Sequence, residues 1–224
     1  MLYGTGWQGG AVLAAFFVSS NLISRLLPHA PGALIDAKAD RRDHWQVYAN
    51  GAAAAVGGGL GIVAPGLGLW LVTAALAAAA ADTWATSVGG RSGVAPRLIW
   101  SSRVVPRGSS GGVTRLGTAG AAVGALVVAG TAAIAAGTPG LLPVGTLIGF
   151  LGMVADSTLG ALAQGRFYCP ACGVASEWRV HRCGAATVRE SGLVWLNNDG
   201  VNFLATALAA GAGGIAWYWL APSP

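Results

Sequence analysis

The chain has 224 residues, of which 13 are Lys or Arg and 8 are Asp or Glu, so 9% are charged while 54% are hydrophobic. An ordinary soluble domain has about 25% charged residues. This composition excludes a soluble globular domain, a disordered tail and a nucleic-acid-binding protein as first interpretations. The net charge of +5, in a chain this apolar, favours membrane topology.

The charged residues are confined to three segments of the chain. Between and around them lie four uncharged stretches of 24, 38, 40 and 25 residues: 1–24, 44–81, 116–155 and 200–224. A helix needs about 20 mostly apolar residues to cross a bilayer core, so each outer stretch holds one span. Each inner stretch holds two, divided at turn residues 64–66 and 137–140. A soluble all-α protein is disfavoured, because these stretches leave no polar face for water.

The sequence therefore predicts an all-α polytopic membrane helix bundle, a single integral membrane domain over residues 1–224. Its six spans are expected at roughly 9–27, 47–64, 67–88, 116–137, 141–163 and 199–220. Lys and Arg occur in the three long loops and are absent from the hinges at 64–67 and 137–140. Because positively charged loops stay inside, we expect a multi-pass protein of the cell membrane with cytoplasmic loops and both termini outside.

Three aspartates lie inside or at the start of predicted spans. Asp82 lies near the end of the third span, Asp156 lies late in the fifth, and Asp199 opens the sixth. An ionisable group within a span is costly and is a functional candidate. The topology places all three at about one depth beneath the cytoplasmic surface. Amides join this layer at Asn50, Asn198 and Asn202.

Such a layer has two interpretations. Helix caps and interhelical hydrogen bonds can explain any one of its residues. Mg²⁺ is usually held by one or two carboxylates together with substrate phosphates. Three aspartates at one depth favour a magnesium site at Asp82, Asp156 and Asp199.

The basic loop at 89–115 contains five arginines and no acidic residue, and its glycine-rich turn at 108–112 leads toward the next span. A glycine-rich turn before a helix presents backbone N–H groups to phosphate, and arginine binds phosphate oxygens with a planar fork. The alternative is a loop that only touches anionic lipid headgroups. The candidate phosphate ligands are Arg91, Arg97, Arg103, Arg107, Gly108, Ser109, Ser110, Gly111, Gly112 and Thr114.

All three cysteines of the chain lie in the segment 164–198, in the pattern C-x2-C-x8-H-x-C formed by Cys169, Cys172, His181 and Cys183. The cytosol disfavours disulfides, and three thiolates with one imidazole make a closed tetrahedral zinc set of the structural type. We therefore expect a Zn²⁺ site in a cytoplasmic loop. The alternative is three reduced thiols in a tight turn with His181 exposed.

Several uncommon polar strings occur together over residues 6–215, among them DTWAT at 82–86, GSSGGVT at 108–114, DSTLGA at 156–161 and NDGVN at 198–202. In these the chain resembles a family of integral membrane proteins long labelled as of unknown function. That family includes animal transmembrane protein 19 and a plant plastid phytyl-phosphate kinase. Family members usually carry further apolar spans ahead of this region. The cysteine loop is similar to bacterial members, whereas eukaryotic members lack it, which argues against catalytic cysteines.

The resemblance implies phosphoryl transfer from a nucleoside triphosphate, CTP or ATP, to an isoprenyl monophosphate of the phytyl or geranylgeranyl type. The three aspartates would then position Mg²⁺, and Arg97 and Arg107 would neutralise phosphates. The remaining arginines, the glycine-rich turn and the three asparagines would bind substrate. Three alternatives stay open: a transporter using the same aspartates, a CTP-dependent cytidylyltransferase of a lipid phosphate, and a noncatalytic assembly partner.

Overall fold

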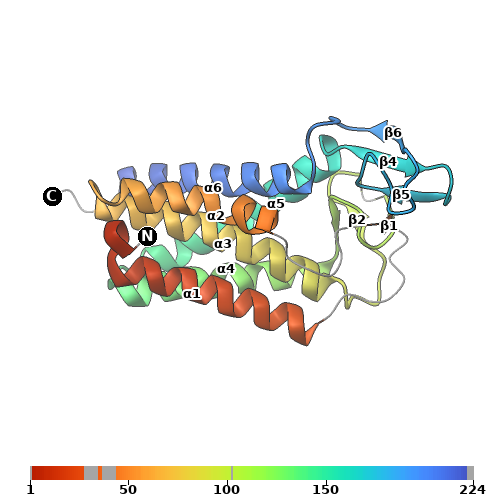
Figure 1. Ribbon diagram of the computed structural model, residues 1–224. Helices are drawn as coiled ribbons and strands as arrows, with labels where there is room; N and C mark the ends of the chain where they lie inside the picture. The colour runs from red at the N-terminus through yellow and green to blue at the C-terminus, as the bar shows by residue number, and fades with distance from the viewer. Residues whose placement is uncertain (1, 28–34, 37–43, 102, 221–224) are drawn as a thin grey trace.

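The computed structural model describes residues 2–27, 35–36, 44–101 and 103–220 (Figure 1). Five of its helices are long and apolar enough to cross a membrane, and α2, with 17 residues, is the shortest helix described. Each predicted span corresponds to one helix, so the polytopic helical bundle is confirmed. The helices are α1 (Leu2–Leu26), α2 (His44–Leu60), α3 (Pro65–Gly89), α4 (Arg115–Ala136), α5 (Leu141–Leu162) and α6 (Asn198–Leu220).

Local chemistry explains where the helices begin and end. Pro65 opens α3, a position that needs no backbone N–H donor. Thr114 caps the start of α4, and Gly137 ends that helix in the left-handed conformation with φ 62°. The first helix begins earlier than the predicted residue 9, because it continues through a kink at Gly6 to Leu2.

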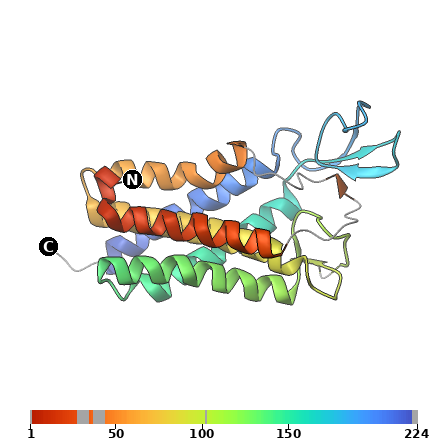
Figure 2. The same cartoon turned by 60° about the horizontal axis from the view of Figure 1, so that its bottom comes forward.

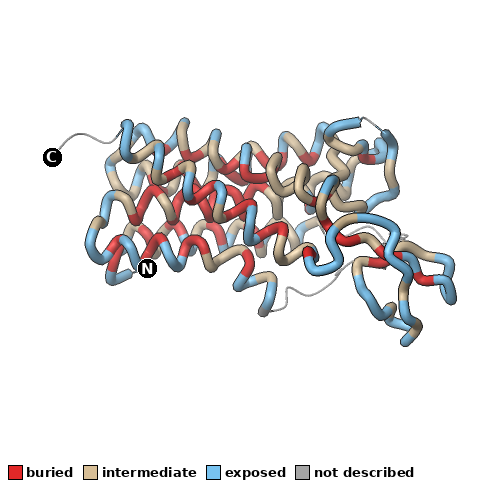
Figure 3. Tube along the Cα trace, turned by 90° about the horizontal axis from the view of Figure 1, so that it is seen from above, coloured by how far each residue is buried: buried red, intermediate tan, exposed pale blue. Residues whose placement is uncertain are grey.

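Helix α3 forms the centre of the bundle and packs against each of the five other helices. Its residues Ala74–Ala81 are 0–2% exposed, and Figure 3 shows buried residues along the middle of the bundle. Small side chains let neighbouring backbones approach closely. A Cβ added at Gly68 of α3 would lie 2.9 Å from the carbonyl oxygen of Gly57 of α2, so the two helices are nearly in backbone contact.

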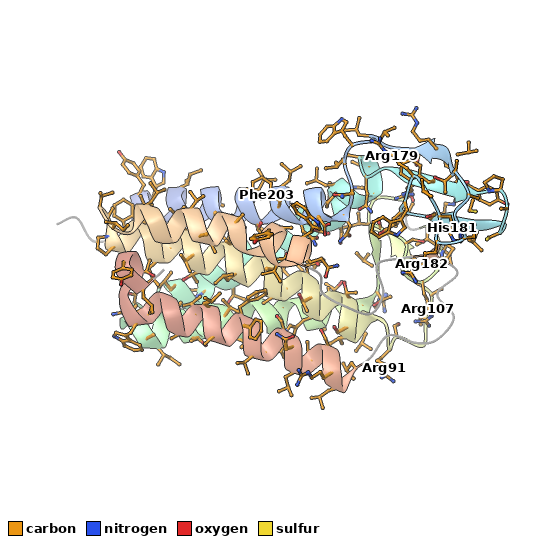
Figure 4. All side chains as sticks on the ribbon, in the orientation of Figure 1. Arg91, Arg107, Arg179, His181, Arg182 and Phe203 are labelled. Carbon is orange, nitrogen blue, oxygen red and sulfur yellow. The ribbon has the colours of Figure 1, made fainter. Side chains whose placement is uncertain are left out.

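The two ends of the bundle differ in character. The three long connections leave from one end, which we call the loop end, and the hinges at 61–64 and 137–140 lie at the other, the hinge end (Figures 1 and 2). Figure 4 shows Arg91, Arg107 and Arg179 gathered at the loop end. The predicted grouping of basic loops on one side of the bundle is therefore present.

The segment between α5 and α6, residues 163–197, folds as a small β lobe, which we call the lobe. Its strands are β4 (Arg166–Cys169), β5 (Val174–Ser176) and β6 (Val188–Ser191), and β1 (Ile35–Asp36) adds a parallel edge in the order β1-β5-β4-β6. In the basic loop, β2 (Arg97–Leu98) pairs antiparallel with β3 (Gly112–Val113). The chain is thus mostly helical, with short strands that the sequence did not predict.

Candidate functional site

Asp82 on α3 and Asp156 on α5 lie close enough for their charges to interact. The helix packing explains this proximity. A Cβ on Gly152 would be 2.4 Å from the Cβ of Ala78, so these two positions are in contact. Both helices run toward the loop end, and each aspartate follows its contact residue by one helical turn. The Oδ2 atom of Asp156 is buried and has no hydrogen-bond partner among the described residues.

Asn202 of α6 lies at the level of this aspartate pair. Gly213 of α6 packs over the α3 turn between Trp70 and Ala74. Because α6 runs antiparallel to α3, the position eleven residues before Gly213 is level with Asp82, and that position is Asn202. Its side chain is buried, with 7% exposed. The structure therefore adds a buried amide to the interior carboxylates, as the sequence predicts.

Gln46 of α2 also reaches this level, and sequence reasoning missed it. Gly57 of α2 packs on Leu71 of α3. Because the two helices are antiparallel, eleven residues toward the loop end from this contact lead to Gln46 on α2 and to Asp82 on α3. A polar side chain early in an uncharged stretch was the available signal. Asn50, one turn further along α2, lies one turn deeper toward the hinge end than the sequence suggests.

Asp199 departs from the expectation of a single depth for the three aspartates. It is the second residue of α6, three residues before Asn202, which places it about 4.5 Å nearer the loop end. The Oδ1 atom of Asn197 accepts the backbone N–H of Gly200 at 2.9 Å and caps this first turn. Asn198 and Asp199 border a cavity beneath the lobe. Two aspartates therefore share one layer, and the third lies one turn outward.

The glycine-rich turn docks on α5 directly after Asp156. Gly111 has φ 77°, and a Cβ there would lie 2.5 Å from the Cβ of Ala161 and 2.6 Å from the carbonyl oxygen of Ser157. Only glycine fits so close an approach with this backbone conformation. The predicted phosphate turn and the predicted metal carboxylate are thus brought side by side.

Hydrogen bonds join this turn to the lobe. The hydroxyl of Ser110 donates to Oε1 of Glu177 at 2.9 Å, and Nε2 of Gln164 donates to the same oxygen at 3.1 Å. The guanidinium of Arg166 donates to the carbonyl oxygen of Ser110 at 3.0 Å. Ser110 therefore holds the turn in place, and its hydroxyl is engaged with a carboxylate.

The other predicted phosphate ligands divide into three groups: two side chains that bind backbone atoms, the residues of the turn itself, and the remaining arginines. The guanidinium of Arg107 donates to the carbonyl oxygens of Gly90 at 3.3 Å and Ser92 at 2.5 Å, and Thr114 accepts the N–H of Gly117 at 3.0 Å. These two side chains therefore form hydrogen bonds with backbone atoms of the protein. The backbone of the turn is shaped by Gly108, with φ 85°, and by the bond from the N–H of Gly112 to the carbonyl of Ser109. The remaining predicted ligands, Arg91, Arg97 and Arg103, are exposed, as are Arg107 and Arg115.

The structure brings Cys169, Cys172, His181 and Cys183 together. Each residue offers one ligand atom, and these four atoms all lie within 4.8 Å of one another. The Sγ atoms of Cys169 and Cys183 are 3.7 Å apart, and Nδ1 of His181 is 3.1 Å from Sγ of Cys183. Two thiolates bound to one tetrahedral Zn²⁺ at about 2.3 Å lie about 3.8 Å apart. The cluster can therefore hold a metal ion, and its donors suit zinc.

Interactions within the cluster separate the thiol pKa values. The hydrogen bond with His181 lowers the pKa of Cys183 to about 6. The hydrogen bond with Cys183 raises the pKa of Cys172 to about 11. One thiolate thus forms readily while a neighbouring thiol keeps its proton. A divalent cation replaces such protons when it binds.

Residues 1–210 match the family described as integral membrane protein DUF92. The chain belongs to this family. It is 29% identical to Protein PGR of Arabidopsis thaliana over 92% of this chain and 80% of that protein. It is also 30% identical to the uncharacterized membrane protein MJ0933 of Methanocaldococcus jannaschii, over 73% of this chain and 68% of that protein. No solved structure matches the chain. The family confirms a multi-pass integral membrane protein.

Proposed function

We propose that this family member is a membrane-embedded phosphotransferase that converts an isoprenyl monophosphate into the diphosphate, using a nucleoside triphosphate and Mg²⁺. The observation that carries the proposal is the Asp82–Asp156 pair, with the glycine-rich turn docked beside it at Ser157. Two neighbouring carboxylates inside an apolar bundle repel each other. A divalent cation offsets this repulsion and suits the buried Oδ2 of Asp156.

In this proposal Asp82 and Asp156 hold Mg²⁺, with Asn202 and Gln46 at the same level to orient phosphate oxygens. Bound Mg²⁺ would supply charge neutralisation for the transferred group. The arginines of the basic loop attract the substrate phosphates, and the turn around Gly111 holds them by backbone N–H groups.

The reaction needs no nucleophile from the protein, since positioning and charge stabilisation are sufficient. An oxygen of the isoprenyl monophosphate attacks the γ-phosphorus of the donor. The bond from this phosphorus to the oxygen bridging the β-phosphate breaks, and the nucleoside diphosphate leaves. The donor approaches from the cytosol at the loop end, while the isoprenyl chain lies in the cell membrane among the apolar helices. In this orientation both termini of the protein are outside the cell.

The aspartate position bears on the alternative of a transporter. Transporter sites of this kind lie near the bilayer midplane. Asp82 is seven residues from the end of α3, about 10 Å from the loop end of that helix. This position favours an enzyme that meets a water-soluble substrate at one surface.

The test is incubation of the purified full chain with Mg²⁺, CTP or ATP, and phytyl or geranylgeranyl monophosphate, followed by mass spectrometry of the products. We expect isoprenyl diphosphate together with the nucleoside diphosphate, and loss of both in Asp82→Asn. Release of inorganic diphosphate would instead identify a cytidylyltransferase. Full activity in Asp82→Asn would refute the metal assignment.

A further inference from the structure

A cavity of about 380 Å³ lies between the lobe and the first turn of α6. This volume falls in the range of small-molecule sites, about 300–1,000 Å³. The residues that give the cavity its chemistry come from both sides: Trp178, Arg179, Trp195, Glu177, Asn198 and Asp199. The cavity therefore combines flat aromatic surfaces with carboxylates, an amide and a guanidinium.

The aromatic wall is built from two segments of the lobe. The guanidinium of Arg179 donates to the carbonyl oxygen of Val194 at 3.1 Å. This bond ties the segment carrying Trp178 to the segment carrying Trp195, whose side chains are 38% and 70% exposed. Tryptophan rings stack on planar ligands, and every nucleobase offers such a face. Figure 4 shows Arg179 on the side of the lobe nearest α6.

The polar wall argues against an isoprenyl chain as the occupant. Glu177, Asn198 and Asp199 place charged and amide groups against the cavity, and an apolar chain packed there would displace water from them at a free-energy cost. A nucleoside presents both a planar ring and hydroxyl and amine groups. The mixture of ring faces and hydrogen-bonding groups matches that ligand class.

The cavity adjoins the proposed phosphate site on two sides. Asp199 borders it, and the Asn202 layer lies about 4.5 Å deeper along α6. Glu177 also borders it and accepts the hydroxyl of Ser110 in the glycine-rich turn. A ligand with its ring in the cavity would direct its phosphates between the turn and the aspartates.

We propose that this cavity binds the base and ribose of the nucleoside triphosphate donor, with the base stacked on Trp195 and Trp178. The identity of the ligand as a phosphoryl donor rests on the proposed function above. The binding of a nucleotide at this place is testable without turnover.

The test compares Trp195→Ala with a matched variant, Trp219→Ala. Trp219 is 75% exposed and lies in the last turn of α6, at the hinge end of the bundle. Equilibrium binding of radiolabelled CDP and ADP with Mg²⁺ to the full chain in detergent is the first readout. We expect Trp195→Ala to weaken binding about 5- to 150-fold, as for loss of a base-stacking ring, and Trp219→Ala to leave it unchanged. Trp178→Phe keeps a ring and should retain most of the affinity.

Steady-state kinetics give a second readout. We expect Trp195→Ala to raise KM for the nucleoside triphosphate while kcat and KM for the isoprenyl monophosphate stay constant. Unchanged nucleotide affinity in this variant, a raised KM for the isoprenyl monophosphate in its place, or no nucleotide binding to the wild-type chain would each overturn the inference. A wild-type chain that binds nucleotide at the cavity yet transfers no phosphoryl group would refute the proposed function and support the cavity assignment.

Discussion

The bundle and the lobe are stabilised by different means. In the bundle, residues Ala74–Ala81 are almost completely buried and the backbones of neighbouring helices approach through glycine and alanine. In the lobe, β4, β5 and β6 have three or four residues each, and β6 is exposed throughout. So small a unit buries too little apolar surface to fold on its own core, and units of this size commonly use a bound metal or a cross-link.

This difference explains where the candidate chemistry lies. The bundle supplies the aspartate pair, the lobe supplies the aromatic cavity and the cysteine cluster, and the turn at Gly111 and Ser110 contacts both. A rigid apolar scaffold holds the costly charges, while a less stable polar unit borders the site proposed for the water-soluble substrate. Changes in the lobe should therefore alter substrate binding and leave the bundle folded.

The largest expected effect comes from Cys169→Ser, which removes a buried ligand of the metal cluster. Structural zinc contributes about 10–16 kcal/mol of apparent binding free energy at pH 7. We expect bound zinc, measured by atomic spectroscopy, to fall from about one per chain to none. Hydrogen exchange in β4–β6 should speed up while the helices keep their protection.

The matched control for this change is Val188→Ser on the exposed strand β6, which adds the same side chain outside the cluster. It should keep its zinc and its exchange pattern. Zinc retained at full occupancy in Cys169→Ser, or helices that lose protection together with the lobe, would show that the two regions are not stabilised separately.

The next effect concerns the phosphoryl transfer that we propose for the bundle. Asp156→Asn keeps the shape of the side chain and removes its charge, so we expect kcat to fall about 100- to 1,000-fold, about 3–4 kcal/mol of transition-state stabilisation. Thermal stability should stay the same or rise, because a charge beside Asp82 is removed from the interior. Product formation and thermal unfolding, measured on one preparation, check this.

Glu190→Gln makes the same chemical change on the exposed strand β6 and serves as the control. It should leave kcat within about twofold. A similar kcat in wild type and Asp156→Asn would mean that the aspartate pair serves only the packing of the bundle.

The sequence predicts the bundle well because the bilayer imposes a length on every uncharged stretch. Helices α4 and α5 begin and end within one residue of the predicted spans 116–137 and 141–163. The lobe was not predicted, since its strands are too short to show a period of two. Its sheet also includes Ile35–Asp36 from a different loop, and no local sequence pattern predicts this pairing.

The sequence picks out the charged residues of the candidate site, but it does not show which residues of neighbouring helices lie at the same level. Asp82 and Asp156 stand out because each interrupts or ends an apolar span. Gln46 and the true depth of Asp199 depend on which residues face each other across glycine contacts such as Gly57 on Leu71. The cavity depends on the fold of the lobe. Neither these levels nor the cavity could therefore be obtained from residue spacing along the sequence.

A smaller effect is expected where the bundle meets the lobe. Gly111→Ala adds a Cβ that would collide with Ala161 and Ser157 at a residue with φ 77°. We expect the turn to lift from α5, with a cost of about 1–3 kcal/mol and a raised KM for the nucleoside triphosphate. Kinetic assays and thermal unfolding provide the measurements.

Two glycines separate the causes of this effect. Gly137 also has positive φ but has no atom within 4 Å of an added Cβ, so Gly137→Ala reports the backbone strain alone. Gly93→Ala, in the same loop and in open space, should change neither KM nor stability. If Gly111→Ala behaves like Gly137→Ala, contact with α5 does not position the turn.

The smallest effect concerns Thr114, which the sequence predicts as a phosphate ligand and the structure shows as the cap of α4 through the N–H of Gly117. Thr114→Ala should lower stability by about 1 kcal/mol with little change in KM. Thr114→Ser keeps the capping oxygen and should restore that stability. Thr118→Ala removes a hydroxyl that donates to the carbonyl of Thr114 and is the neighbouring control. A large rise in KM without loss of stability in Thr114→Ala would show that the hydroxyl contacts phosphate and that the basic loop, rather than the lobe, positions the donor.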